Sequence, residues 1–308
     1  MSTQIIQGSK GLDSCVPITL GIVAGSGVLP SIIAQTITKR ITTFASLEYK
    51  TSLAPNLATR VVAACHKLET GTELAELVAS HAWVKAGQLG KIIKFFKSEG
   101  VTEVVFAGGI KRPNLLRGFW PDLTAINVMA RAGSVQDDKL LREIAREFER
   151  NGMQVLAAHT VLPELLTPDN FKIGTLTAQQ QIDARLGWRT AFALGELDVG
   201  QTAAVHRGMV IALEGIEGTD ACIKRAADLC GPGFTVVKRA KPQQDERLDL
   251  PTIGDGTIDV LTAAKAGALI IHAGASLLLN PLEIERKARG AGLTIVAVRS
   301  EDDIIRMI

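Results

Sequence analysis

The stretch Ile18–Ala24, ITLGIVA, is followed at once by Gly25-Ser26-Gly27 and then by helical apolar spacing from Leu29 to Arg40. A β-branched apolar run, a glycine turn and a 3.6-residue period predict a buried strand, a tight turn and a helix. The same alternation continues with strands expected over 60–65, 101–107 and 153–158 and helices over 73–80, 91–98, 122–131 and 137–150. Because such βαβ units are right-handed and build parallel sheets, the first half predicts an open parallel sheet with helices on both faces.

A second α/β pattern follows a turn-rich stretch. Residues 161–176 contain two prolines, which predicts a linker between an amino-terminal domain, 1–160, and a carboxyl-terminal domain, 177–308. The remaining expected elements are strands over 203–206, 209–213, 235–239, 268–272 and 293–298 and helices over 178–194, 219–229, 257–265 and 281–289. Arg207-Gly208 between the first two strands is typical of a hairpin. The predicted fold class is α/β, with two domains of mostly parallel sheets and flanking helices.

Composition excludes several classes of protein. The 308 residues carry 34 Lys and Arg against 32 Asp and Glu, a net charge of +2, and 46% of them are apolar. This composition supports a packed core and lacks the basic excess of proteins that bind nucleic acids. No apolar run approaches the roughly 18 residues of a membrane-spanning helix, and the first residues lack the apolar block of a secretory signal. We therefore expect a cytoplasmic protein with no nucleic-acid partner.

Two glycine loops follow predicted strands, where ligands bind in open α/β sheets. Gly25-Ser26-Gly27 begins a dinucleotide fingerprint, but Pro30 stands where its third glycine belongs. Both a phosphate-binding loop and a tight strand-to-helix turn fit this stretch. In the second loop, Gly108-Gly109 precedes Lys111 and Arg112, which fits either an anion site or a basic surface turn.

Charged residues gather in two later loops. Glu214, Glu217 and Asp220 follow a predicted strand, and such oxygen ligands suit Mg²⁺, although Asp220 with Thr219 also suits a helix start. The stretch from Lys238 to Gly254 combines cations and carboxylates ahead of Pro251. A metal–diphosphate site requires both charge signs, and a solvated charge run is the alternative. The four cysteines, Cys15, Cys65, Cys222 and Cys230, lie too far apart for a zinc or disulfide framework.

These stretches, taken in order, resemble the LpxI family, the UDP-2,3-diacylglucosamine pyrophosphatases of lipid A biosynthesis. The resemblance rests on GIVAGSGVLP, GQLGKIIKFFKSEGV, VVFAGGIKRP, DDKLLR, AAHTVLPELL, LGELDVGQ, EGTD and KPQQDERLDLPTIG. The order and spacing of these motifs are shared with the family. The chain departs from it in an extension before Ile18 and in a longer segment over 43–68.

The resemblance implies Mg²⁺-dependent hydrolysis of UDP-2,3-diacylglucosamine to UMP and 2,3-diacylglucosamine 1-phosphate, lipid X, in a cleft between two α/β domains. It assigns catalysis to the aspartate of DLPTIG, which is Asp249 here. It also favours a homodimer, and the lipid substrate leaves peripheral contact with the cytoplasmic face of the inner membrane open. The rival classes are a non-catalytic nucleotide-sugar binding protein and another nucleotide-sugar phosphotransfer enzyme.

The expected site combines three groups of residues. Asp249, with Asp220 or Glu217, holds Mg²⁺ or orients a water molecule. Lys241 and Arg247, beside Lys238, neutralise charge on the diphosphate. The residues expected to bind substrate are Gly25, Ser26, Gly27, Gly108, Gly109, Lys238, Thr219 and Gln201.

Overall fold

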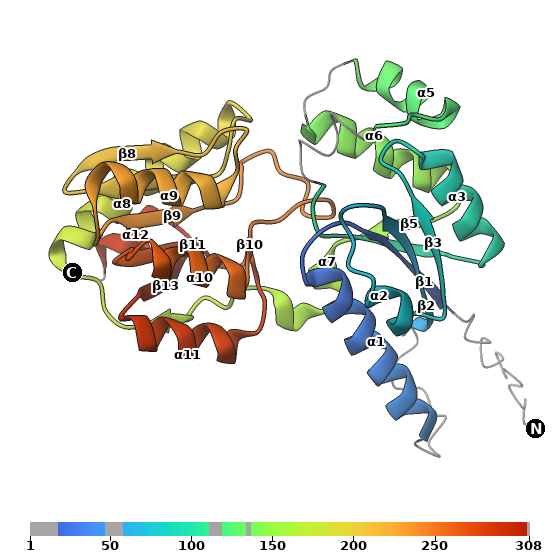
Figure 1. Cartoon of the computed structure of the whole chain (residues 1–308), viewed down its shortest axis with the longest axis horizontal. Coiled ribbons are helices and arrows are strands. Elements are labelled where there is room, and N and C mark those ends of the chain that lie inside the picture. The colour runs from blue at the N-terminus through green and yellow to red at the C-terminus, as the bar shows by residue number, and fades with distance from the viewer. Residues whose placement is uncertain (1–17, 47–57, 111–118, 134–136, 307–308) are drawn as a thin grey trace, which may run out of the picture.

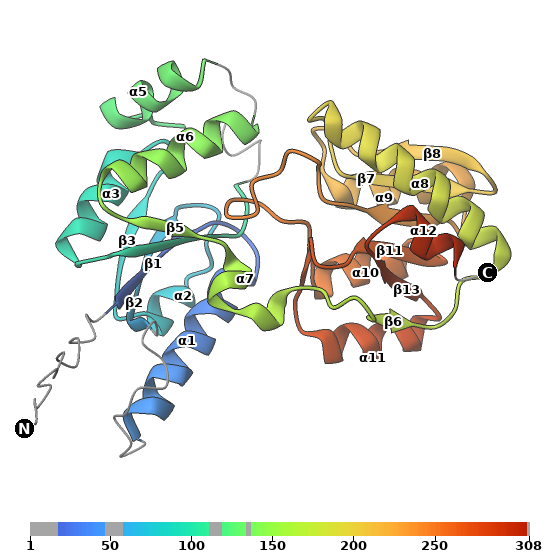
Figure 2. The same ribbon diagram turned by 180° about the vertical axis from the view of Figure 1, so that it is seen from behind.

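A computed structural model of the full chain describes residues 18–46, 58–110, 119–133 and 137–306. It consists of two α/β halves that lie side by side, as Figures 1 and 2 show from opposite sides. The expected α/β fold with two domains is confirmed. Lys111, Arg112 and Cys15 lie outside the described residues.

The amino-terminal half is built on a parallel sheet of five strands in the order β3-β2-β1-β4-β5. The strands are β1 (Ile18–Ala24), β2 (Ala58–His66), β3 (Ser80–Val84), β4 (Glu103–Ala107) and β5 (Gln154–Leu156). The helices are α1 (Leu29–Ser46), α2 (Leu74–Leu77), α3 (Leu89–Ser98), α5 (Leu123–Ala132) and α6 (Asp137–Arg150). Neighbouring residues of β1 point into different cores: Ile22 packs with α1 and α2, and Val23 packs with α3 and α6. Helices therefore cover both faces, as the apolar runs predicted.

The carboxyl-terminal half contains a six-stranded sheet in the order β6-β13-β11-β9-β7-β8. Its strands are β6 (Lys172–Ile173), β7 (Thr202–His206), β8 (Met209–Leu213), β9 (Thr235–Lys238), β11 (Ala268–His272) and β13 (Thr294–Val298). The central strands β9, β11 and β13 are parallel, whereas β6 and the β7–β8 hairpin add antiparallel edges. The hairpin at Arg207-Gly208 is confirmed.

The helices of this half are α8 (Ala178–Glu196), α9 (Thr219–Cys230), α10 (Asp255–Ala263), α11 (Pro281–Ala291) and α12 (Glu301–Ile305). One face of the sheet packs against α9, α10 and α11, and the other packs against α8 and α12. A small parallel pair, β10 (Thr252–Ile253) and β12 (Leu277–Leu278), lies beside the main sheet. Between the halves run α7 (Ala158–Val161) and the 3-10 helix η1 (Pro163–Leu165). Within the predicted linker, β6 already pairs with β13.

Two predicted elements differ from the structure. The helix expected over 73–80 is only the short α2, and Ser80 begins β3 instead. In β3 only Val84 is buried, because β3 is an edge strand, so its sequence lacks the apolar run that marks the central strands. The strand expected over 153–158 ends at Leu156, and Ala158 begins α7. No helix in the described part of the chain has both the length and the apolarity needed to cross a membrane.

Candidate functional site

A cavity of about 510 Å³ opens between the two halves. Its lining comes from the loops after β1 and β4, from the loop between β9 and β10 and from the start of α10, with further residues from α7, α9 and β12. The lining residues are Ser26, Gly27, Val28, Leu29, Phe106, Gly108, Gly109, Ala158, Gln201, Asp220, Lys238, Glu246, Arg247, Leu248, Asp249, Leu250, Thr252, Gly254, Asp255, Gly256, Thr257, Leu277 and Leu279. The carboxyl ends of parallel strands from both sheets therefore meet at one cavity, the usual place for a ligand in this fold class.

Two glycines join the ends of β1 and β4 at the cavity. A Cβ atom on Gly25 would lie 2.4 Å from the Gly109 carbonyl oxygen, and one on Gly108 would lie 2.1 Å from the Ser26 carbonyl oxygen. The backbone N–H groups of Gly25 and Ser26 donate to the carbonyl oxygens of Ala107 and Gly109, at 2.8 Å and 2.7 Å. These two N–H groups are thus engaged within the protein, as the tight-turn alternative requires. Gly25 lies outside the lining, while the other four glycine-loop residues expected to bind substrate line the cavity.

Asp249 projects into the cavity from the loop between β9 and β10. Its side chain is accessible within the cavity, yet protein atoms from both halves surround it, and this desolvation raises the pKa of the carboxyl group. The positive charges of Lys241 and Lys238 oppose the rise in that pKa. Burial and the two lysines therefore act on the pKa of the Asp249 carboxyl group in opposite directions, and the effect of burial is the larger.

Lys238 ends β9 and is only 8% exposed. Its Nζ donates to the carbonyl oxygen of Thr252 at 3.1 Å, and burial lowers the pKa of the ammonium group. The nearby carboxylates Glu214, Asp249 and Asp220 oppose that fall in pKa. Among the described residues Lys238 forms no ion pair with a carboxylate, and it lines the cavity, where it can bind an anionic ligand.

The other two expected cations have partners within the protein. Lys241 Nζ lies 2.6 Å from Asp198 Oδ1 in a pair of side chains that are 10% and 14% exposed. Lys241 lies outside the lining, so it acts on Asp249 through its charge and not by contact with a ligand. Arg247 lines the cavity, but its guanidinium group binds Asp245 at 2.8 Å and Glu149 at 2.7 Å.

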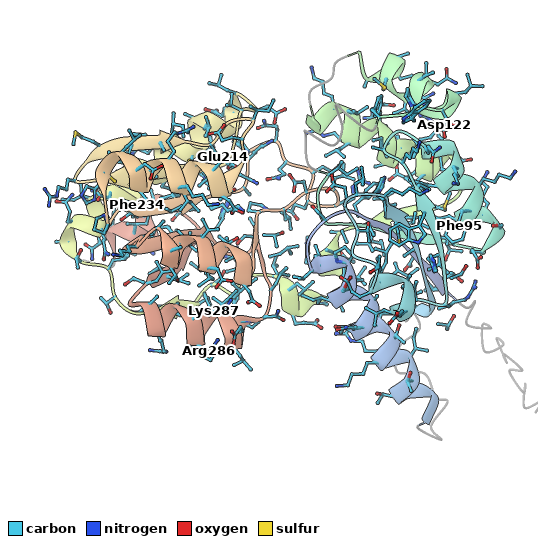
Figure 3. All side chains as sticks on the ribbon, viewed as in Figure 1. Phe95, Asp122, Glu214, Phe234, Arg286 and Lys287 are labelled. Atoms are coloured by element: carbon cyan, nitrogen blue, oxygen red, sulfur yellow. The ribbon has the colours of Figure 1, made fainter. Side chains whose placement is uncertain are left out.

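Glu214, labelled in Figure 3, follows β8 and is buried, at 8% exposed. It accepts a hydrogen bond from the Thr219 hydroxyl at 2.9 Å and another from the Gln201 backbone N–H at 3.1 Å. Thr219 is consequently directed toward Glu214, outside the lining. It is also not the cap of α9, because Gly218 occupies that position.

The three residues expected to bind metal separate into two groups. Asp249 and Asp220 line the same cavity. Glu217 lies outside the lining and forms an ion pair with Arg225 at 2.7 Å. Among the residues that the structure describes, no three His, Cys, Asp or Glu side chains are grouped as a metal site. The expected set of three is therefore reduced to two carboxylates at the cavity.

The first turn of α10 was missed as part of the site. Gly254, Asp255, Gly256 and Thr257 all line the cavity, and the helix begins at Asp255, two residues earlier than predicted. The N–H groups of Thr257 and Ile258 donate to the Gly254 carbonyl oxygen, whereas those of Asp255 and Gly256 have no partner among the described residues. These two N–H groups and the helix dipole favour an anion there. The buried Oδ1 of Asp255 and Oε1 of Gln201 have no hydrogen-bond partner within the described protein. The glycines at 254 and 256 were the available signal for close backbone approach.

Both halves of the chain match known protein domains. The protein-family model for the LpxI N-terminal domain matches residues 19–165, and the family model for the LpxI C-terminal domain matches residues 171–296. The chain belongs to the LpxI family. It is 31% identical over 301 residues to the UDP-2,3-diacylglucosamine pyrophosphatase LpxI of Caulobacter vibrioides, an alignment that covers 92% of this chain and 98% of that relative. The two matched regions correspond to the two halves that enclose the cavity.

Proposed function

We propose that this LpxI-family chain hydrolyses the diphosphate of UDP-2,3-diacylglucosamine and releases UMP and 2,3-diacylglucosamine 1-phosphate in lipid A biosynthesis. One observation carries the proposal: Asp249, Lys238 and the start of α10 meet in the cavity between the two halves. The chain is related to a protein named UDP-2,3-diacylglucosamine pyrophosphatase. A carboxylate, a buried cation and a helix N-terminus suit the hydrolysis of a phosphoanhydride.

In the proposed reaction, a water oxygen attacks one phosphorus, and the anhydride P–O bond breaks. Asp249 orients this water and accepts its proton, a role that a carboxyl group with a raised pKa performs well. Lys238 and the N–H groups at the start of α10 neutralise the charge that develops on the two phosphates. Asp249 and Lys238 are the catalytic residues of this proposal.

Mg²⁺ fits the oxygen donors of the cavity. Mg²⁺ commonly takes one or two carboxylates and completes its shell with water and phosphate oxygens. Asp249 and Asp220 would hold it, and the orphaned Oδ1 of Asp255 is a further oxygen donor at the same cavity. When bound, the ion would offset the negative charge of the diphosphate.

Apolar side chains from both halves complete the cavity and suit an acylated substrate. They are Val28, Leu29, Phe106, Leu248, Leu250, Leu277 and Leu279. We propose that they contact the acyl chains, because apolar walls with a few polar groups are typical of such pockets. A homodimer, a cytoplasmic location and peripheral contact with the inner membrane stay predictions.

The test is UMP release from UDP-2,3-diacylglucosamine by the purified chain, with Mg²⁺ and then with excess EDTA. We expect release with Mg²⁺ and its loss with EDTA. UDP-glucosamine without acyl groups is the matched substrate, and equal turnover of both would favour another nucleotide-sugar enzyme. Tight binding without UMP release under either condition would favour a binding protein.

A further inference from the structure

The loop that carries Asp249 belongs to the carboxyl-terminal half by sequence but reaches the amino-terminal half in space. It connects β9 with β10, and both Figure 1 and Figure 2 show it extending from the carboxyl-terminal sheet toward α6 and β5. Within the loop, the backbone N–H groups of Leu248 and Asp249 donate to the Asp245 carbonyl oxygen at 2.9 Å and 3.3 Å. These bonds shape the turn but do not fix its position relative to either half.

The residues on each side of Asp249 pack into the cores of the amino-terminal half. Leu248 packs against the core shared by α3, α5 and α6. Leu250, 7% exposed, belongs to the core around α1. Asp249 therefore lies between two leucines that pack against apolar side chains of the amino-terminal half.

Helix α6 supplies polar and apolar contacts to the same loop. Arg142 Nη2 donates to the Gln243 carbonyl oxygen at 2.5 Å, and Glu149 pairs with Arg247 at 2.7 Å. Leu141 adjoins Leu248 and Asp249, and the space between them is too small to admit a water molecule. Arg142 and Glu149 are two turns apart, so one side of the helix follows the loop along its length.

We propose that Leu141 and Arg142 of α6 are positioning residues that hold the Asp249 loop in place, so that the chemistry of the carboxyl-terminal half depends on the amino-terminal half. The proposal rests on the proposed function of Asp249. Leu141 and Arg142 belong to the DDKLLR stretch, Asp137–Arg142. Neither residue lines the cavity, so they would act on Asp249 from outside it.

The contacts between α6 and the loop should contribute unequally to holding Asp249 in position. Glu149 and Arg247 are 41% and 39% exposed, and exposed ion pairs contribute little. Leu141 borders the reacting residue itself, and Arg142 binds the loop backbone through a charged donor. Since a displacement of about 1 Å in an active site can cost about a hundredfold in rate, these two residues should control turnover without touching substrate.

The experiment compares Arg142→Gln and Leu141→Ala with two matched variants on the same helix. Arg146→Gln removes a guanidinium that pairs with Glu143 within α6. Leu140→Ala truncates a leucine that packs against the same core as Leu248 but, unlike Leu141, does not line the small space beside Asp249. In Arg142→Gln and Leu141→Ala we expect kcat for UMP release to fall about tenfold, with KM nearly unchanged. In the two control variants we expect kcat to stay within about twofold of the unaltered chain.

Hydrogen exchange at the amides of Leu248 and Asp249 gives a readout that does not depend on activity. We expect exchange to accelerate in Arg142→Gln and to stay unchanged in Arg146→Gln. Arg142→Gln removes no core side chain, so it tests the proposal even if Leu141→Ala does not fold.

Exchange and kcat that match the controls would overturn the positioning role while leaving the proposed function intact. Full activity in Asp249→Asn would instead overturn the proposed function, and the exchange data would still decide whether α6 holds the loop.

Discussion

Lys238 Nζ and the Thr252 carbonyl oxygen, 3.1 Å apart, tie the end of β9 to the start of β10. The two residues flank the loop that carries Asp249, so this hydrogen bond closes the base of the loop. Lys238 also lines the cavity. Lys238 thus combines a structural hydrogen bond with a place in the cavity lining.

Replacing Lys238 by methionine should lower kcat/KM for UMP release by about a hundredfold, the typical cost of losing one preorganised charge-stabilising donor. The measurement is steady-state UMP release. Hydrogen exchange of the backbone amides around Thr252 shows whether the loop keeps its structure in the variant. Lys238→Met activity within about twofold of the unaltered chain would remove Lys238 from the proposed machinery.

Lys241→Met should act mainly on stability. It leaves Asp198 without its partner in a pair of side chains that are 10% and 14% exposed. Breaking such a pair should lower the free energy of unfolding by about 3 kcal/mol. Urea unfolding measures the change, and the double variant Lys241→Met with Asp198→Asn should recover part of it. A loss of turnover without a loss of stability would argue for direct contact with substrate.

Gly108→Ala should be strongly destabilising. Gly108 has a φ of +78°, and its added Cβ would meet the Ser26 carbonyl oxygen at 2.1 Å. Gly109 provides the matched control, since nothing lies within 4 Å of a Cβ there. Thermal unfolding should show a loss of about 3 kcal/mol or more for Gly108→Ala and a change within about 0.5 kcal/mol for Gly109→Ala. Similar melting temperatures for the two variants would contradict the close contact between the loops.

Asp249→Asn should stabilise the metal-free protein at neutral pH. Burial raises the pKa of Asp249 above its unfolded value, so ionisation costs the folded state stability. That cost is absent below the unfolded pKa and grows until the pH passes the folded pKa. Urea unfolding in EDTA from pH 8 downward should therefore show a gain for Asp249→Asn that shrinks as the pH falls. A gain that grows toward low pH would contradict the raised pKa.

The central strands were predictable because their burial is continuous. Ile18–Ala24 and Ala268–His272 have the same bounds in the prediction and in the structure. The edge strand Met209–Leu213 also keeps its predicted bounds, because its sequence, MVIAL, is apolar throughout although only Ala212 is buried. The edge strand at Ser80 was missed because its sequence, SHAWV, contains no apolar run. Local patterning thus identifies elements that carry an apolar face and misses those held mainly by backbone pairing.

The sequence predicted which loops carry the candidate site, but it did not predict which charged residues of the site form ion pairs within the protein. Loops after strands identified Lys238 and Asp249, because the fold class places strand ends at a common edge. The partner of Lys241, Asp198, lies 43 positions away, and sequence spacing carries no signal for such a contact. The same applies to Arg247 and Glu149, which lie in different halves of the molecule.

The most direct measurement is turnover and substrate binding by Asp249→Ala under identical conditions. We predict that UDP-2,3-diacylglucosamine binds the variant with an affinity within about tenfold of the unaltered chain, while kcat for UMP release falls about a thousandfold. Undiminished kcat in the folded variant would contradict the catalytic role of Asp249.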